Sequence, residues 1–486
     1  MPTQSDPQTP RRQLSLFDSV NIIVGIVIGT GIFATPQLAA MPLDSEPLLM
    51  MCWVAGGLVS LMGALCYAEL IVRFPKAGGD YHFLKGCYGR RLGFVFAWTQ
   101  FWVVRPGSIG AMAFIFAQYF QESFAPTADQ SLTIVWAIAL IAVVTLLNVL
   151  GLRVGKTTQN MLTCAKVVGM LAIFVCALLT PSAQSVEPGL TENAETVTSD
   201  VTEEASPMHA LLLSALAIGQ SLIFVMFAFG GWTDIAFVGA EVRRPEHNTF
   251  RAMTIGVVVI TTVYLLMNFS YLHVLGFEGL QTSNTVAAST ARIAIGGWGE
   301  RFLSALILIS SAGALNGIVL TGSRIYYAFG QDHALFSWLG KWHQRFTTPV
   351  NSLLMQGIVT CGLTALFGSQ FWARFFQGEA GGNFRPADGF ERMVLYTAPA
   401  YWFFVTLVVL SLYYYRRKHP VEKPPFRVPG YPVTPMLFTL VCAGIIYSTM
   451  QYAIDDQRAV YEAFWSAGLV FLGLLVSFFS RPPNKA

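Results

Sequence analysis

The stretch from Val20 to Pro36, VNIIVGIVIGTGIFATP, is an apolar run of membrane-spanning length that carries glycines where a helix most needs stability. Gly29, Thr30 and Gly31 lie near the middle of this run. Each interior glycine costs a helix about 1 kcal/mol relative to alanine, so we expect two half-helices. Their ends expose N–H and C=O groups that must face protein or a polar ligand. Alternatively, Gly25 and Gly29 form a GxxxG packing face.

Apolar runs of about 20 residues, the length that crosses ~30 Å of hydrocarbon, recur along the whole chain. Of its 486 residues 54% are hydrophobic and only 12% are charged, which is too apolar for a soluble multidomain protein. We therefore expect an all-α polytopic membrane protein with about 12 transmembrane helices. The expected spans are 18–40, 48–72, 92–120, 132–151, 160–180, 208–240, 253–275, 299–330, 350–368, 391–415, 433–452 and 460–480.

Basic residues are distributed unevenly between the two sides of these spans. An even number of spans places both termini on one side, and most of the 30 lysines and arginines then fall on that side. Because cytoplasmic loops are rich in Lys and Arg, we expect both termini to be cytoplasmic, in a plasma or inner cell membrane. Segment 182–206, acidic and without a basic residue, is then a disordered outward loop. Segment 369–390 is an outer surface loop or a lid.

A second interrupted span, Leu222 to Glu241, follows about two hundred residues after the first, and Gly230 and Gly231 break it. Two interrupted hydrophobic segments in corresponding positions indicate a transporter built from inverted five-helix repeats, with broken helices 1 and 6. The expected organisation is a cytoplasmic tail 1–17, a first repeat 18–180, an acidic extracellular loop 181–207, a second repeat 208–415, and helices 11 and 12 with a short tail over 416–486.

The two breaks together offer complementary partial charges to a ligand. A helix N-terminus after Gly31 presents N–H groups, and the chain before Gly29 and before Gly230 presents carbonyls. A free amino acid has a carboxylate for the first and an ammonium for the second, so the backbone alone can bind it. The alternative is that two structural kinks coincide.

Ionisable residues inside spans are candidates for function, because charge is costly in lipid. Lys166 lies near the start of the fifth span, where it either serves the site or extends its stem to the cytoplasmic surface. Asp234 pairs with a helix dipole, carries a proton, or makes structural hydrogen bonds. Arg105 precedes Pro106, and we expect it to bind carbonyls that this proline frees. Capping and ion pairing account for Glu69, Glu241 and Arg324.

Missing motifs argue against several classes of function. The sequence has no HExxH, GxSxG, P-loop or complete GxGxxG, so we expect no enzyme activity and no cofactor. Its seven cysteines include no CxxC pair and its seven histidines no mid-membrane pair, so we expect no metal site. Nothing predicts binding to nucleic acid. A membrane sensor would need a soluble output domain, and only short tails flank the spans.

Short motifs along the whole chain carry a resemblance to a known family. They are GTGIF at 29–33, ALCYAEL at 64–70, FPKAGGDYHFL at 74–84, RPGS at 105–108, FAFGGW at 227–232, GAEVRRPEHN at 239–248, SSAGALNG at 310–317, SRIYYAFGQD at 323–332, TPV at 348–350 and PFRVPGYP at 425–432. With the lysine of helix 5, this set resembles the amino acid–polyamine–organocation (APC) superfamily, and within it the L-type amino-acid transporter family and its bacterial relatives. The resemblance implies alternating access with free amino acids as substrates.

The resemblance also implies roles for individual residues. Its carboxylate-binding loop corresponds to Gly29, Thr30 and Gly31, and the helix 6 loop that takes the amino group corresponds to Phe227, Ala228 and Gly230. Phe227 occupies the place of the family's aromatic gate. The resemblance assigns coupling and gating roles to Lys166, Ser310 and Phe227, and we add Asp234 to them as an ionisable residue within a span. A cation lies near the position of Lys166 in related sodium-coupled carriers, so its ammonium looks like a replacement for that cation.

Departures from the family pattern refine these implications. Gly230 stands where carriers of cationic amino acids can have an acid, which favours neutral substrates. Asp234 stands where mammalian members more often have an aromatic residue. The loop at about 121–131 lacks the cysteine by which animal members join a heavy chain, so no disulfide-linked heavy-chain subunit is expected.

The function predicted from these observations is sodium-independent exchange of neutral L-amino acids across the cell membrane. The alternative is a proton-coupled symporter of the same fold for amino acids, or for polyamines or cationic amino acids. Side chains of the third, sixth, eighth and tenth spans select the substrate, and no sequence pattern specifies which substrate they favour. Candidates for this side-chain pocket are Val103, Val104, Ser108, Thr233 and Trp402.

Overall fold

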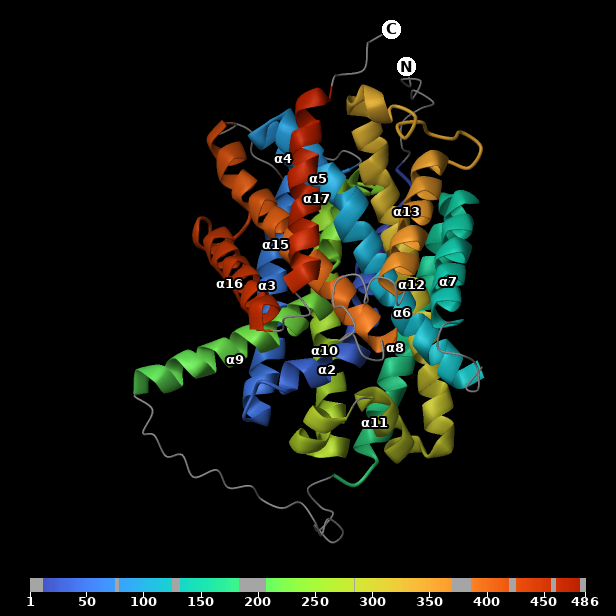
Figure 1. The fold of residues 1–486 in the computed structure, drawn as a ribbon, viewed down its shortest axis with the longest axis vertical. Coiled ribbons are helices and arrows are strands. Elements are labelled where there is room, and N and C mark those ends of the chain that lie inside the picture. The colour runs from blue at the N-terminus through green and yellow to red at the C-terminus, as the bar shows by residue number, and fades with distance from the viewer. Residues whose placement is uncertain are drawn as a thin grey trace.

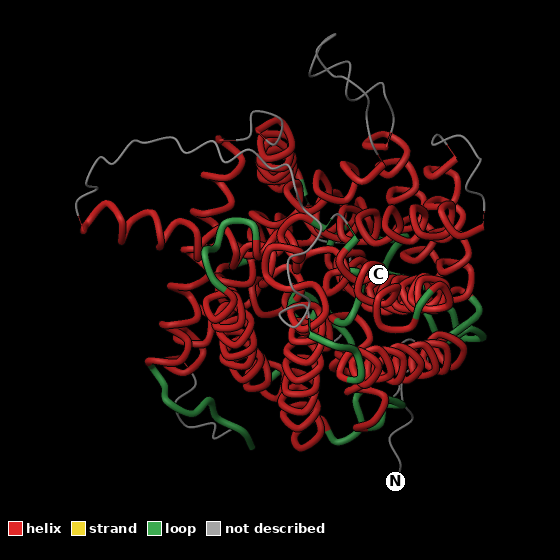
Figure 2. Tube along the Cα trace, turned by 90° about the horizontal axis from the view of Figure 1, so that it is seen from below, coloured by secondary structure: helices red, strands yellow, loops and turns green. Residues whose placement is uncertain are grey.

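A computed structural model describes residues 12–74, 78–124, 132–182, 207–283, 285–368, 386–418, 425–455 and 460–480. These ranges are helical apart from short connections, and Figure 2 shows no strand among them. Their only β-type contacts are two isolated bridges, Leu14 to Val242 and His343 to Thr348. The all-α fold class is therefore confirmed.

The helices follow one another along the chain with few long connections (Figure 1). They are α1 (Leu16–Val27), α2 (Gly31–Ala40), α3 (Glu46–Arg73), α4 (Asp80–Tyr88), α5 (Arg90–Thr99), the π-helical turn η1 (Gln100–Val104), α6 (Arg105–Phe124), α7 (Leu132–Val149), α8 (Leu152–Leu178), α9 (Pro207–Ala228), the 3-10 helices η3 (Trp232–Ala236) and η4 (Gly239–Glu241), α10 (Pro245–Thr282), α11 (Val286–Ile295), α12 (Gly297–Asp332), the 3-10 turn η5 (Ala334–Phe336), α13 (Val350–Gly368), α15 (Pro386–Lys418), α16 (Val433–Asp455) and α17 (Val460–Phe479).

Helix occupies every one of the expected spans, and the prediction of a polytopic membrane protein is confirmed. Within the described ranges, eight helices are long and apolar enough to cross a membrane, or nine if the bent pair α1 and α2 is one span. Two further expected spans contain shorter apolar helices, Ser214–Ala228 and Phe464–Phe479. The count of twelve spans therefore stays a prediction.

The first span breaks where its glycines predict. Helix α1 ends at Val27, α2 begins at Gly31, and the two are bent by 46°. Ser15 and Asp18 form a reciprocal capping box at the start of α1, each side chain accepting the other's backbone N–H. Helix α1 packs against α8, α10 and α12, whereas α2 packs against α9. Helix α10 contacts both halves, so the break adds α9 as a neighbour of the second half while α10 spans the two.

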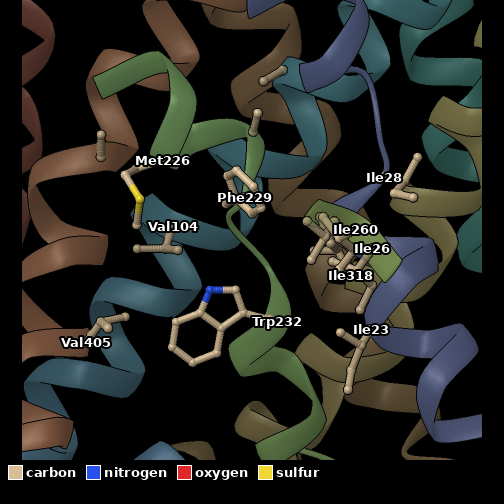
Figure 3. Packing of buried hydrophobic residues seen from close by; sticks show 14 of the residues in the cluster. Ile23, Ile26, Ile28, Val104, Met226, Phe229, Trp232, Ile260, Ile318 and Val405 are labelled. Carbon is tan, nitrogen blue, oxygen red and sulfur yellow. The ribbon is translucent and has the colours of Figure 1, made fainter. Parts of the chain in front are cut away.

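The second span also breaks, but its second half differs from expectation. Helix α9 ends at Ala228, and Gly231 adopts a left-handed conformation with φ of 108°. Figure 3 shows the chain without helix between Phe229 and Trp232. The expected second half-helix is replaced by the short 3-10 helices η3 and η4. Tertiary contacts override helical preference here, because the buried carboxylates of both segments are bound by arginines of other helices.

The expected span 92–120 is not one regular helix but comprises α5, η1 and α6, and Pro106 is the reason. A proline lacks the N–H that would serve the carbonyl of Trp102, and the helix widens into the π-helical turn η1 just before it. Tyr396 donates its hydroxyl to the Trp102 carbonyl at 2.9 Å, and Tyr326 donates to the Gln100 carbonyl at 3.1 Å. Two tyrosines, not Arg105, therefore satisfy these carbonyls, and the expectation for Arg105 is wrong.

The ends of the described chain lie together at one end of the bundle. The backbone N–H of Leu14 donates to the Glu241 carbonyl at 2.8 Å, and Glu241 pairs with Arg324 near the C-terminal end of α12. At the other end of the sequence, the Ser480 hydroxyl lies 2.6 Å from Nδ1 of His333, directly after α12. Both described ends therefore share one side of the fold.

Candidate functional site

A cavity lies at the meeting point of the two breaks. Its volume is about 70 Å³, and a water molecule needs roughly 10–15 Å³ on this scale, so the space holds several waters or a small polar ligand. Residues of α1, α2, η1, α6, α9, η3, α12 and α15 surround it. The lining residues are Ile26, Val27, Gly31, Val104, Arg105, Ser108, Met112, Met226, Phe227, Ala228, Gly230, Gly231, Asp234, Ile318, Thr397, Ala398, Tyr401 and Trp402.

Backbone polar groups at the first break remain available at this cavity. In the described chain the N–H groups of Gly31 and Ile32, in the first turn of α2, donate no hydrogen bond. They present the partial positive end of a helix dipole. A Cβ at Gly31 would lie only 3.0 Å from Cα of Ala228, so glycine is required for this close approach of the two breaks. At the first break, two unpaired N–H groups therefore lie close to the second break at Ala228.

Tyr264 of α10 joins the two breaks, and sequence analysis missed it. Its buried hydroxyl lies 2.7 Å from the Val27 carbonyl and 2.9 Å from the Ala228 carbonyl, the last residues of α1 and α9. Its ring packs edge-on against Trp53 and Phe229. One of 17 tyrosines, it carries no local signal that would single it out.

Lys166 occupies the opposite side of the first break. Its ammonium donates to the carbonyls of Gly25 at 2.8 Å, Ile28 at 2.6 Å and Ser310 at 3.1 Å. The side chain is fully buried, so it does not extend to the cytoplasmic surface. The Ser310 hydroxyl adds a contact of 3.1 Å to the Ile28 carbonyl and 3.2 Å to that of Gly29. A fixed cation and a hydroxyl thus hold the carbonyl end of the broken helix.

Asp234 and Arg105 form a buried ion pair in the cavity wall. Nη1 and Nη2 of Arg105 donate to the two carboxylate oxygens of Asp234 at 2.5 and 2.9 Å. Nε of Arg105 donates to Gln100 at 3.1 Å, and the Thr321 hydroxyl donates to Asp234 at 2.6 Å. Of the alternatives for Asp234, the structure shows hydrogen bonding within an ion pair. Each residue was singled out from the sequence, but their partnership was not predicted.

Two further acids near the helix ends are ion-paired, in line with expectation. Glu69 accepts from Arg73 at 2.9 Å and from Arg416 at 2.5 Å. Glu241 accepts from Arg324 at 2.8 Å, and both side chains are almost completely buried. Neither pair lines the cavity. These charges tie helices together around the site without contributing to its wall.

The remaining predicted site residues divide between wall and surroundings. Phe227, Ala228 and Gly230 line the cavity, and the ring of Phe227 packs edge-on against Phe390 of α15 at 5.6 Å. Gly29 and Thr30 lie at the break but outside the lining set.

The side-chain pocket shows the same division. Of the five candidates, the lining set contains Val104, Ser108 and Trp402. Val103 is buried elsewhere, and the Thr233 hydroxyl instead lies 3.3 Å from that of Tyr401. The prediction lacks several lining residues, because no sequence motif distinguishes them from other residues of the spans. They include Met112, Met226, Ile318, Thr397, Ala398 and Tyr401.

Three predictions fall on segments that lie wholly or partly outside the described residues. They concern the acidic loop 182–206, the loop 369–390 and the loop 121–131. In the described chain, no group of three or more His, Cys, Asp or Glu residues could hold a metal ion.

The fold and the cavity define a polytopic helical membrane protein with a small cavity where two interrupted spans meet. Comparison with known proteins extends this description. A profile of the amino acid permease family matches residues 14–476, and the chain therefore belongs to the amino acid permease family. Its relatives are amino-acid transporters rather than enzymes.

Several characterised relatives align with nearly the whole chain. The b(0,+)-type amino acid transporter 1 of Homo sapiens is 27% identical, over 97% of this chain and 90% of its own length. The serine/threonine exchanger SteT of Bacillus subtilis (strain 168) is 26% identical, over 92% of this chain and 94% of its own length. The cystine/glutamate transporter of Homo sapiens is 27% identical, over 90% of this chain and 80% of its own length. Exchangers are thus among the relatives.

Proposed function

We propose that this protein exchanges neutral L-amino acids across the membrane without sodium. The observation that carries the proposal is the position of the Lys166 ammonium. It occupies the carbonyl end of α1 beside the cavity, where the backbone oxygens of Gly25 and Ile28 would otherwise attract a mobile cation. A covalently attached cation needs no sodium gradient to hold the break in place.

In the proposed complex, the two breaks bind the zwitterionic part of the substrate. The free N–H groups of Gly31 and Ile32 suit the carboxylate, and the carbonyl end of α9 near Phe227 and Gly230 suits the ammonium. Phe227 covers the site together with Phe390. Gly29 and Thr30 shape the loop that presents these donors.

The side-chain part of the cavity supports the assignment to neutral substrates. Ile26, Val27, Met112, Met226 and Ile318 give it a largely apolar wall. Ser108 and Trp402 add polar groups that can orient a small substrate. A mainly apolar wall disfavours a charged side chain, because an unpaired charge would lose its water there.

Exchange is favoured by the Bacillus relative, whose name describes an exchanger. Proteoliposomes loaded with unlabelled amino acids and assayed with labelled L-serine and L-leucine test the proposal. We expect uptake that requires amino acid inside and is unchanged when choline replaces sodium. A strict sodium requirement, or equal uptake into empty vesicles, would contradict it.

Proton-coupled symport is a second candidate because of Asp80 in α4. Its carboxylate is buried, Tyr67 donates to Oδ2 at 3.1 Å, and Oδ1 has no partner within the described chain. Burial raises the pKa of Asp80 to about 8, with a further rise from Asp234 opposed by the Tyr67 hydrogen bond and by Arg105. An imposed acid-outside gradient should accelerate net uptake if this candidate is right and leave one-for-one exchange unchanged if it is wrong.

The cellular setting is part of the same proposal. We place the protein in the plasma or inner membrane with both termini cytoplasmic and the acidic segment 182–206 outside. The two inverted repeats, 18–180 and 208–415, would then rearrange around the cavity to give alternating access. No disulfide-linked partner is required, so the chain should transport as an isolated protein.

A further inference from the structure

The Arg105–Asp234 ion pair is unusual among the charges of this protein because it lines the cavity. Both residues belong to the cavity wall, together with the backbone of Gly31 and Gly230 from the two breaks. Only 5% of the Arg105 side chain and 4% of the Asp234 side chain are exposed. A ligand bound at the breaks therefore shares a water-poor space with one full positive and one full negative charge.

The geometry of the pair cancels these charges at short range. The guanidinium meets the carboxylate with two parallel N–H···O bonds, the arrangement in which Arg and a carboxylate fit best. Gln100 and Thr321 hold the outer sides of the pair, and the Phe237 ring lies 4.8 Å from the guanidinium carbon. The pair therefore adds polar groups to the mainly apolar wall but no net charge.

The pair also joins two segments of the site that are far apart in the sequence. Arg105 begins α6 after the π-helical turn, and Asp234 lies in the 3-10 segment that follows the second break. Five hydrogen-bond donors fan out from a guanidinium, and the described contacts use three of them. Capacity for a further anionic group remains on Arg105, but its charge is already compensated.

We propose that the Arg105–Asp234 pair sets the charge class of the substrate side chain by keeping the cavity neutral. Removing one charge of the pair then admits substrates whose side chain is opposite in charge to the residue that remains. This inference rests on the proposed transport of neutral amino acids. Without the Asp234 charge, Arg105 becomes an uncompensated buried cation that an acidic side chain can pair with. Without the Arg105 charge, Asp234 plays the same part for a basic side chain.

The test compares variants in proteoliposomes with labelled L-serine, L-leucine, L-glutamate and L-lysine. Asp234→Asn keeps the size of the side chain and removes its charge, while one of the two oxygens that accept from Arg105 becomes an amide donor. We expect the ratio of L-glutamate to neutral uptake to rise on the order of tenfold or more, as one uncompensated charge at short range in a protein interior implies. Arg105→Gln should raise the L-lysine ratio by a similar factor, so that two variants of opposite sign test the idea even if one fails to fold.

Matched controls separate the cavity charge from general loosening of the fold. Glu241→Gln breaks a second buried Arg–carboxylate pair that does not line the cavity, and it should admit neither charged amino acid. The double variant Arg105→Gln with Asp234→Asn removes both charges and should also admit neither. Gain of L-glutamate uptake by these controls would overturn the inference.

The outcome distinguishes this inference from the function on which it rests. If the wild type carries neutral amino acids and the folded Asp234→Asn and Arg105→Gln variants gain no charged substrate, the ion pair does not set the charge class and the inference is wrong. If the wild type itself takes L-glutamate as readily as L-serine and L-leucine, both the neutral assignment and this inference fail.

Discussion

Replacing Lys166 by methionine tests the role of the buried ammonium most directly. Methionine keeps a long unbranched side chain, so the space among α1, α8 and α12 stays filled while the charge and its three hydrogen bonds disappear. The variant therefore separates the cation from packing. If Lys166 organises the first break, substrate binding should weaken although no residue that lines the cavity has changed.

The expected size follows from the carbonyls that lose their donor. In an unbroken helix the N–H of Gly29 would serve Gly25, but here it bonds to the Val27 carbonyl at 2.7 Å. Gly25 is then left unpaired, while Ile28 retains the hydroxyl of Ser310 at 3.1 Å. One orphaned and one weakened buried acceptor cost about 2–4 kcal/mol in total. Even about 1.4 kcal/mol of this at the break corresponds to a tenfold loss of substrate affinity.

Affinity measured by calorimetry on purified protein, and exchange in proteoliposomes, give the readouts. Lys156→Met on the same helix is the matched control: Lys156 is partly exposed and pairs with Asp18 at 3.2 Å, away from the break. We expect the control to bind normally and Lys166→Met to bind at least about tenfold more weakly. A Lys166→Met protein with the affinity and rate of the wild type would refute the reasoning.

Two residues of the site region and two outside it give further predictions. Gly230→Val should abolish transport in a folded protein, because Gly230 lines the cavity and the added side chain would occupy the space of the ligand; normal uptake would argue against the backbone site. Tyr264→Phe should lower the free energy of unfolding by about 1–3 kcal/mol and slow exchange, since the carbonyls of both breaks lose their shared donor, and unchanged thermal unfolding would contradict this. Because the pKa of Asp80 is raised from 3.8 to about 8, its stabilising contribution is full below pH ~4 and is lost as the pH rises through 8; Asp80→Asn should flatten that part of the stability profile, measured by chemical denaturation. A single cysteine at Ser199 should react with membrane-impermeant reagents outside intact cells, and labelling only from the cytoplasm would reverse the proposed orientation.

Some features of the fold could be predicted because they depend on neighbouring residues. The apolar runs predict helices of membrane-spanning length, since lipid leaves no other partner for the backbone. Gly29 and Gly31 predict the first break, because glycine weakens a helix locally. The second break at Gly230 and Gly231 follows in the same way, and the structure places the two side by side.

Other features could not be predicted, because distant parts of the chain create them. The 3-10 form of the segment after Gly231 depends on ion pairs that Asp234 and Glu241 make with other helices. The carbonyls freed near Pro106 attract tyrosines from α12 and α15, which left Arg105 available for Asp234. No local sequence pattern predicts which of these distant donors and acceptors will pair.

The sequence alone predicts the class of protein and the positions of both helix breaks. It also identifies Lys166 as an ionisable residue inside a membrane span. Each of these depends on composition or on a few adjacent residues. Only the tertiary structure decided which groups meet across the cavity. Tyr264 joins the two breaks from α10, and Arg105 finds Asp234 well over a hundred residues away. Such pairings are selected by the packing of whole helices, since a buried donor or charge must find whichever partner that packing brings within hydrogen-bond distance.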